Sequence, residues 1–193
     1  MRRVLGSDAP HPVERWIVAY VLYVAAEASS AGWIAPQLHR VGFSQSTGAV
    51  VTAGFWSGLA VGRVLTRPLS KRLSNHGLVI GGLGLAVALA GVSTVDALAP
   101  YSYPLMGLVI ALVYPLGLIW YTVLCPHDGD GLALLILTMM FGGVLGPATE
   151  SFTVSLAGIH AVPFVIATFA LLTLATFASA LRFTPITLPE APT

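Results

Sequence analysis

The sequence predicts an all-α, polytopic membrane protein built as a bundle of six transmembrane helices. Only 9% of its 193 residues are charged and its mean hydropathy is +0.85, which is too apolar for a water-soluble domain with a polar surface. Six apolar segments reach the length of about 20 residues that a membrane helix needs, whereas barrel strands have about 10 residues and alternate with polar positions. The expected spans are residues 16–38, 47–69, 77–98, 101–124, 132–157 and 161–183.

Polar segments flank the spans, a leader at 1–15 and a tail at 184–193. The leader has no short apolar core followed by a small-residue cleavage site, so we do not expect a signal peptide. Short loops rich in Lys and Arg stay in the cytoplasm. We therefore expect a multi-pass plasma (inner) membrane protein with both termini cytoplasmic. With six spans that side receives every cation except Arg40, namely Arg2, Arg3, Arg15, Arg63, Arg67, Lys71, Arg72 and Arg182.

The first span concentrates its polar side chains on one face. At 100° per residue, Tyr20, Tyr23, Glu27 and Ser30 align, and Gln37 continues their line. A carboxylate at bilayer depth costs about 3 kcal/mol, so it normally faces protein or water. Because removal from water favours the neutral form of a carboxyl group, we expect Glu27 to exchange protons within a cavity. The alternative is a structural acid that is hydrogen-bonded at a helix interface.

The second span combines a row of glycines with a cluster of cations, in the stretch GFWSGLAVGRVLTRPLSKR at 54–72. Glycines repeated every four residues form a smooth stripe on which another helix backbone can pack closely. The stretch therefore predicts a helix interface followed by a cytoplasmic anchor. The glycines are Gly54, Gly58 and Gly62, and the cations are Arg63, Arg67, Lys71 and Arg72.

The fourth span resembles the first in having hydrogen-bonding groups on one face, where Tyr103, Tyr114 and Tyr121 fall together. Pro115 removes one backbone hydrogen bond in mid-membrane, so we expect a helix break beside a cavity. Tyr114 is the candidate for that cavity, whereas tyrosines near the span ends also suit an aromatic belt. The apolar stretches VIGGLGLAVALAGVSTV and VPFVIATFALLTLATFASAL of the third and sixth spans contain no ionisable residue and suit a lipid-facing or supporting position.

The fifth span carries a buried acid, Glu150, in its outer half, after a glycine-rich segment that includes Gly143 and Gly146. We place Glu150 with the residues of the substrate and proton pathway, in a gate or interface role near a partner half. A hydrogen-bonded structural acid is again the alternative.

No metal, cofactor or nucleic acid is expected. The loop CPHDGDG offers Cys125, His127, Asp128 and Asp130, but adjacent donors in a short turn with two glycines are typical of a solvated connection. The single cysteine excludes an internal disulfide and a Cys-based zinc cluster. No stretch combines a basic surface with stacking aromatic residues.

The pieces of the second span together resemble the loop motif of the major facilitator superfamily, in the version between its eighth and ninth helices. That resemblance rests on Gly58, Gly62-Arg63, Pro68-Leu69 and Lys71-Arg72, and the segments EASSAGW, ALVYPLG and GGVLGPATE fit the same register. It covers residues 12–183 as one six-helix half, the C-terminal one, and is nearest to the sugar-permease and drug-efflux branches. An Asp and a Gly that the motif often carries are replaced by Lys71 and Ser74, so an Asp-based latch is not expected.

The resemblance implies that the first and fourth spans line a central cavity, the second and fifth contact the other half, and the third and sixth lie outside. Because one half cannot alternate access alone, we expect two copies to pair as a parallel homodimer in the bilayer, with the glycine faces of the second and fifth spans at the seam. The expected function is transport of an unidentified small molecule, coupled to protons through Glu27.

Other functions remain open. The chain could be a non-transporting interaction module, a fragment or designed half, that needs a separate N-terminal half. An intramembrane serine hydrolase is the remote alternative. Its nucleophile motif needs a glycine where Phe55 precedes Ser57, and His160 falls in a loop. We therefore do not expect an enzyme.

Overall fold

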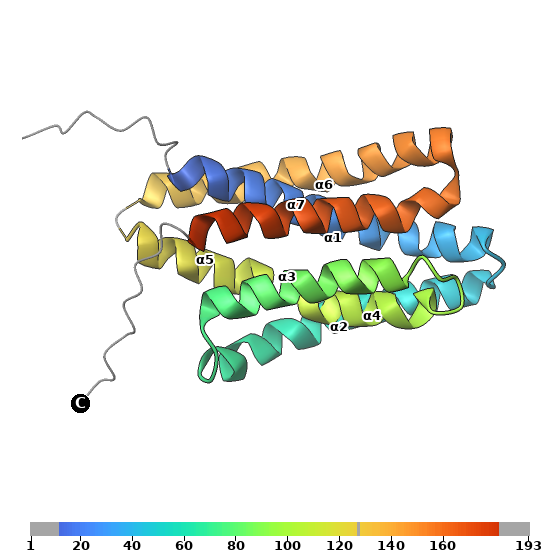
Figure 1. Ribbon diagram of the computed structural model, residues 1–193, viewed down its shortest axis with the longest axis horizontal. Coiled ribbons are helices and arrows are strands. Elements are labelled where there is room, and N and C mark those ends of the chain that lie inside the picture. Colours follow the sequence, from blue (N-terminus) through green and yellow to red (C-terminus); the bar gives the residue numbers. More distant parts are fainter. Residues whose placement is uncertain (1–11, 127, 182–193) are drawn as a thin grey trace, which may run out of the picture.

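In the part of the chain that the structure describes, six helical segments are long and apolar enough to cross a membrane (Figure 1). The computed structural model describes residues 12–126 and 128–181, so residues 1–11, the expected tail and His127 lie outside the described part. Within it, the elements are α1 (Pro12–Arg40), α2 (Gln45–Ser70), α3 (Asn75–Val92), α4 (Ala99–Ile110), α5 (Val113–Leu124), α6 (Gly129–Ala157), the short 3-10 helix η1 (Ile159–Ala161) and α7 (Val162–Leu181).

The fourth span is broken, as predicted. α4 and α5 together form this span, and the chain leaves the helix at Ala111 and Leu112 between them. Pro115 explains the position of the break, because it has no N–H for the Ala111 carbonyl and its ring crowds that carbonyl. The largest of the other boundary differences are that α1 already begins at Pro12 and that α3 ends at Val92 rather than at residue 98.

Short loops with hydroxyl caps connect the first helices. Ser44 accepts a hydrogen bond from the Thr47 backbone N–H at 3.1 Å at the start of α2, and Ser74 does the same for Gly77 at 3.3 Å at the start of α3. Each cap satisfies one N–H group that the first helical turn leaves unpaired. Short connections make consecutive spans antiparallel, so the start of α1 and the end of α7 lie at the same end of the bundle (Figure 1).

The helix α1 lies at the centre of the packing, because it contacts α6, α7 and α2. On the other side α2 packs against α4, and α3 packs against α4, α5 and α7. Figure 1 shows α1, α6 and α7 above α2, α3 and α4. At the end where α1 begins, Trp16 packs edge-on against Trp120 and Phe177 with ring centroids 5.0 and 5.2 Å apart, which fills the bundle with aromatic rings there.

The glycine stripe of α2 is a packing seam, but its partner is α4 of the same chain. A side chain at Gly58 would overlap the Pro104 carbonyl oxygen, and one at Gly62 would overlap that of Leu108. At Gly54 a Cβ atom would lie 3.0 Å from the Pro104 ring. The expectation that this stripe forms the seam with a second chain is therefore wrong, because the α4 backbone already occupies it.

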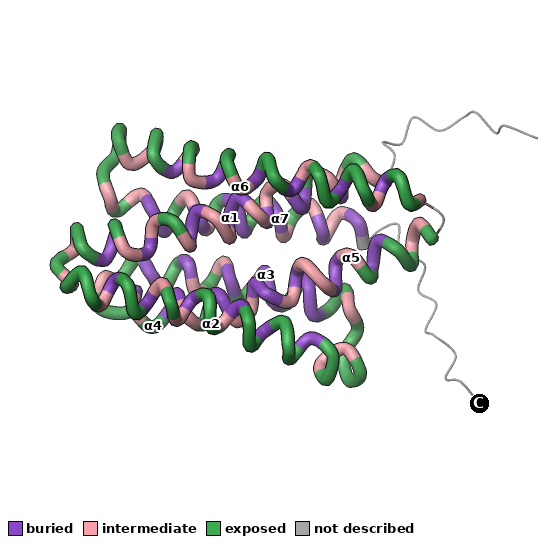
Figure 2. Tube along the Cα trace, turned by 180° about the vertical axis from the view of Figure 1, so that it is seen from behind, coloured by how far each residue is buried: buried purple, intermediate pink, exposed green. Residues whose placement is uncertain are grey.

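The glycines of α6 are used in the same way, against α1. Side chains at Gly142 and Gly146 would overlap the carbonyl oxygens of Val21 and Ala25. At Gly143 a Cβ atom would meet only the Val24 side chain, at 4.0 Å, so Gly142 takes the packing position expected for Gly143. The fifth-span glycines thus also pack within the chain. Figure 2 shows the buried residues of α2 and α6 on their inner sides, with exposed residues along their outer sides.

Candidate functional site

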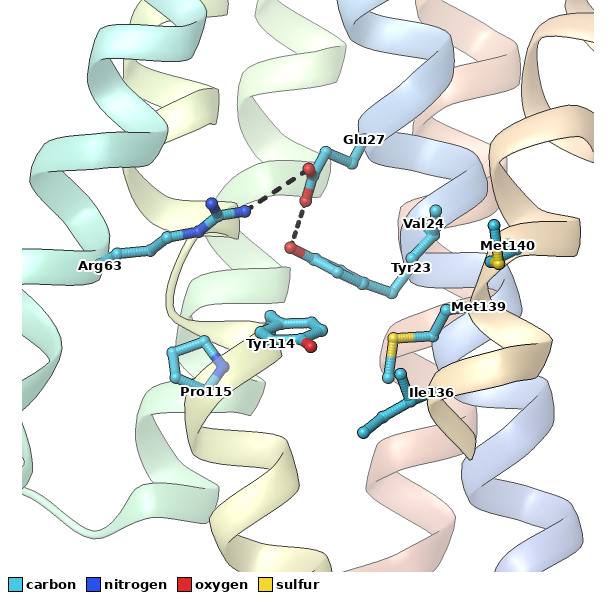
Figure 3. Close-up of a pocket in the computed structure, with 9 residues that line it drawn as sticks. All are labelled: Tyr23, Val24, Glu27, Arg63, Tyr114, Pro115, Ile136, Met139 and Met140. Carbon is cyan, nitrogen blue, oxygen red and sulfur yellow. Dashed lines mark hydrogen bonds and ion pairs between the residues drawn. The ribbon is translucent and has the colours of Figure 1, made fainter. Parts of the chain in front are cut away.

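A cavity of about 650 Å³ opens between α1, α2, α5 and α6 (Figure 3). The helix α1 contributes Tyr23, Val24 and Glu27, and α2 contributes Arg63. The break in the fourth span brings Tyr114 and Pro115 to its edge, and α6 closes it with Ile136, Met139 and Met140. Three of the predicted pathway residues, Tyr23, Glu27 and Tyr114, are thus brought together at one site, and no residue of α3 or α7 lines it.

The carboxyl group of Glu27 has two partners, one at each oxygen. The Tyr23 hydroxyl donates a hydrogen bond to Oε2, and Nη2 of Arg63 lies 3.7 Å from Oε1. The Glu27 side chain is 16% exposed, whereas that of Arg63 is 51% exposed. This carboxyl group lines the cavity and is also bound by groups of α1 and α2, so proton exchange and the alternative of a hydrogen-bonded structural acid at a helix interface both stay predictions.

Arg63 has a different position from the one expected of it. The sequence places Arg63 in the cationic loop motif. In the structure its guanidinium reaches into the cavity toward Glu27 (Figure 3). The close approach of Gly62 to Leu108 and Ala111 brings this turn of α2 near the break of the fourth span. A signal was present in the sequence, since Arg63 lies within the apolar run 47–69 and a cation inside a span normally pairs with an acid.

The other predicted polar residues of α1 lie behind the cavity wall. Tyr20 is fully buried and its hydroxyl donates to the Tyr114 carbonyl oxygen at 2.9 Å, which ties α1 to the start of α5. Ser30 is also fully buried and donates to the Ala26 carbonyl at 2.8 Å. Gln37 accepts a hydrogen bond from the Tyr103 hydroxyl, so the polar faces of the first and fourth spans meet along their length.

Comparison with known proteins identifies the fold. No family model and no curated protein sequence matches the chain. Among solved structures, it is similar to the crystal structure of a major facilitator superfamily transporter, FucP, in the outward conformation. The TM-score is 0.80 with 18% sequence identity, over 89% of this chain and 43% of that chain. The chain has the fold of one half of a major facilitator superfamily transporter.

Glu150 lies outside the cavity. Its side chain is 0% exposed on the same face of α6 as Gly142 and Gly146, and the Ser29 hydroxyl of α1 is the polar group beside it. Among the described residues, neither Ser29 nor either carboxyl oxygen of Glu150 completes a hydrogen bond. Glu150 thus faces α1 of its own chain, and its expected gate or interface role near a partner half stays a prediction.

The loop between α5 and α6 serves as a helix cap. Asp128 accepts hydrogen bonds from the Tyr121 hydroxyl at 2.6 Å and from the Gly131 backbone N–H at 2.8 Å. These two hydrogen bonds hold the pKa of Asp128 below its ordinary value, whereas burial raises the pKa of the nearby Cys125 thiol. No group of three potential metal ligands occurs among the described residues.

The other cations of the loop motif and the serine considered for hydrolysis lie outside the cavity. Arg67, Lys71 and Arg72 are exposed at the end of α2. The Ser57 hydroxyl donates to the Ala53 carbonyl at 2.8 Å, and no hydrogen bond joins it to a histidine among the described residues. His160 lies 4.0 Å from Asp96, between η1 and the turn before α4.

Proposed function

We propose that the chain is one half of an alternating-access transporter, that two copies pair in parallel to complete it, and that transport is coupled to protons at Glu27. The observation that carries the proposal is the cavity, which places an acid, a cation and two tyrosines beside a broken helix. Unwound backbone beside a membrane cavity is a common feature of transporter binding sites.

A parallel homodimer suits the fold because the halves of this superfamily share one topology and are related by an axis along the membrane normal. The chain spans 43% of the length of FucP, so two copies approximate one complete transporter. The helices that flank the cavity, α2 and α6, expose large apolar side chains that a second copy can cover. These include Val61 and Val64 on α2 and Met140 and Val144 on α6.

The orientation of the proposed transporter follows from its cations. Arg67, Lys71 and Arg72 lie at the end of α2, on the same side of the bundle as the start of α1. Loops rich in Lys and Arg are retained in the cytoplasm. We infer that this side is cytoplasmic and that the protein resides in the plasma (inner) membrane.

Glu150 has a different proposed role from Glu27. It is fully buried between α6 and α1 and does not line the cavity, and its carboxyl oxygens complete no hydrogen bond among the described residues, so its burial there is costly. Opening of this contact would expose the carboxyl group to water, so Glu150 is the candidate for a gate between the two helices.

The test is transport by the chain alone in proteoliposomes that contain an internal pH indicator. Sugars, amino acids, organic acids and organic cations are added outside, and a coupled substrate acidifies the interior. Glu27→Gln is expected to abolish proton-driven accumulation while leaving exchange of internal for external substrate. Glu14→Gln, at an exposed position of the same helix, is the matched control and should leave both intact.

Two results would count against the proposal. Unchanged proton coupling in the Glu27 variant would remove the coupling role. Transport that occurs only when a separate six-helix half is added would replace the homodimer by the alternative, in which this chain is a module that needs a complementary half.

A further inference from the structure

We propose that the cavity binds a small organic monoanion with an apolar or aromatic body, and that it does so together with a proton on Glu27. This inference names the substrate class of the transporter proposed above, and so it rests on that function.

The carboxyl oxygens of Glu27 determine where a proton can bind. Oε2 already accepts the Tyr23 hydroxyl, whereas Oε1 faces the guanidinium of Arg63 at 3.7 Å. Protonation of either oxygen neutralises the carboxylate that Arg63 faces. Proton uptake by Glu27 and the ion pair with Arg63 exclude each other, because a protonated oxygen no longer attracts the cation as a carboxylate does.

Charge balance then points to the ligand. Arg63 cannot release its own proton, so protonation of Glu27 leaves the cavity with one uncompensated positive charge. An unpaired cation at this depth is costly. A monoanion on Arg63 restores neutrality, and by linkage the anion and the proton favour each other's binding.

Arg63 is placed to accept such an anion. Its side chain is 51% exposed on the cavity wall, and among the described residues Nη2 forms its one ion pair, at a distance longer than a hydrogen bond. A guanidinium carries five N–H donors in a planar fork that matches a carboxylate. Most of those donors remain for a ligand even while Glu27 is ionised.

Among the described residues that line the cavity, no other charged group faces this pair. On its own helix Glu27 has Tyr23, α2 supplies Arg63, α5 supplies Tyr114, and the cavity residues of α6 are Ile136 and two methionines, which do not titrate. The carboxyl group of Glu150, also on α6, does not line the cavity.

The rest of the wall determines the body of the ligand. Apart from the ion pair, the cavity presents two tyrosine hydroxyls and otherwise apolar side chains, and one of the hydroxyls already binds Glu27. A polyhydroxylated ligand would leave its hydroxyl groups unpaired there, at a cost for each group. The aromatic ring of Tyr114 and the Met139 and Met140 side chains suit an aromatic or branched apolar body (Figure 3).

The experiment measures binding of benzoate, 4-hydroxybenzoate and phenylacetate to the full chain in lipid nanodiscs, with empty nanodiscs as the blank. Methyl benzoate and benzylamine serve as neutral and cationic probes of similar shape. At least one of the three anions is expected to bind more tightly at about pH 5.5 than at about pH 8, by about tenfold or more. The neutral and cationic probes should bind more weakly, without this pH dependence.

Variants assign the effect to the two side chains. Arg63→Gln should lose anion binding by about tenfold or more, whereas Arg67→Gln, a cation of the same helix outside the cavity, should not. Glu27→Gln mimics the protonated acid, so it should bind the anion at high pH as tightly as the natural chain does at low pH. The double variant of Glu27→Gln and Arg63→Gln leaves no unpaired charge, and it should fold and fail to bind.

Failure of this inference is distinguishable from failure of the proposed function. Absence of binding by all three anions, or binding that Arg63→Gln leaves unchanged, overturns the inference even if the proteoliposomes carry another substrate with protons. Anion binding with the expected variants but without transport by the chain alone supports the inference and contradicts the proposed function.

Discussion

At the scale of single residues, the proposed coupling of proton binding to cation pairing rests on the Glu27 carboxyl group and its two neighbours. One oxygen accepts the Tyr23 hydroxyl and the other faces Arg63, so the carboxyl group lies between a hydrogen-bond donor of its own helix and a cation of α2. The chemistry therefore depends on two helices, because Tyr23 and Glu27 lie on α1 and Arg63 lies on α2.

Asp128 offers a residue-scale prediction about stability and pH. Its pKa in the folded protein is lowered by the hydrogen bonds from Tyr121 and Gly131. A carboxyl group whose pKa is lower in the folded state stabilises that state fully above its unfolded pKa, and the contribution is lost as the pH falls through the folded pKa. The thermal unfolding temperature of the natural chain should therefore fall in acid, below about pH 4.

The substitution Asp128→Asn isolates this effect, because asparagine still caps a helix but does not titrate. We expect a slightly lower unfolding temperature at neutral pH and a flatter decline in acid. Asp130→Asn is the control, since Asp130 is exposed two residues further on in the first turn of α6. If the Asp128 and Asp130 variants declined in acid with the same slope as the natural chain, the role given to Asp128 would be wrong.

At the scale of helices, two glycine seams hold the elements that carry the cavity. The α2–α4 seam brings Gly62 against Leu108 and thereby sets the position of Arg63. The α1–α6 seam at Gly142 and Gly146 sets the opposite wall. Close backbone contact of this kind is a main source of helix association in a membrane, where lipid is as apolar as the side chains.

A substitution at the first seam should destabilise the fold. Gly62→Ala places a Cβ atom on the Leu108 carbonyl oxygen and the Ala111 side chain, and a backbone oxygen cannot rotate away. We expect a loss of about 1–3 kcal/mol in the free energy of unfolding, measured by denaturant titration in mixed micelles. Gly81→Ala on α3, where no atom lies within 4 Å, is the matched control and should be neutral or slightly stabilising. Equal stability of the two variants would contradict the packing described.

The sequence predicts the positions of the helices better than it predicts which helices pack against each other. The six spans and the break before Pro115 depend on local apolar length and on one missing N–H group, so they can be recognised from the sequence. The helix that packs against the glycine stripe at Gly58 is determined by the fold of the whole chain. The prediction that a second chain packs there was wrong, because α4 of the same chain does.

The candidate site shows the same limit. Glu27, Tyr23 and Tyr114 were predicted because polar residues on apolar helices stand out individually. A cation near the end of a span can either anchor the span at the cytoplasmic side or pair with an acid inside the membrane. The sequence places Arg63 in the loop motif directly after Gly62 and therefore favours the anchor. Only the spatial approach of α2 to α1 distinguishes an anchor from a partner of Glu27.

At the scale of the whole molecule, the proposed function requires a second copy opposite the cavity, because the fold matches less than half of the similar transporter chain. The cavity is lined by four helices of one half, and large apolar side chains of the flanking α2 and α6 are exposed, with Val64 at 75% and Met140 at 72%. The fold corresponds to 43% of the FucP chain. The central claim is therefore that a second copy completes the cavity.

Native mass spectrometry of the protein released from lipid nanodiscs tests that claim most directly. The chain has a mass of 20.1 kDa, and we predict a species of twice that mass as the dominant one. Met140→Glu, on the exposed side of α6, should shift the distribution toward the single chain, whereas Phe164→Glu on α7, away from the cavity, should not. A single chain as the dominant species at every protein-to-lipid ratio would contradict the homodimer.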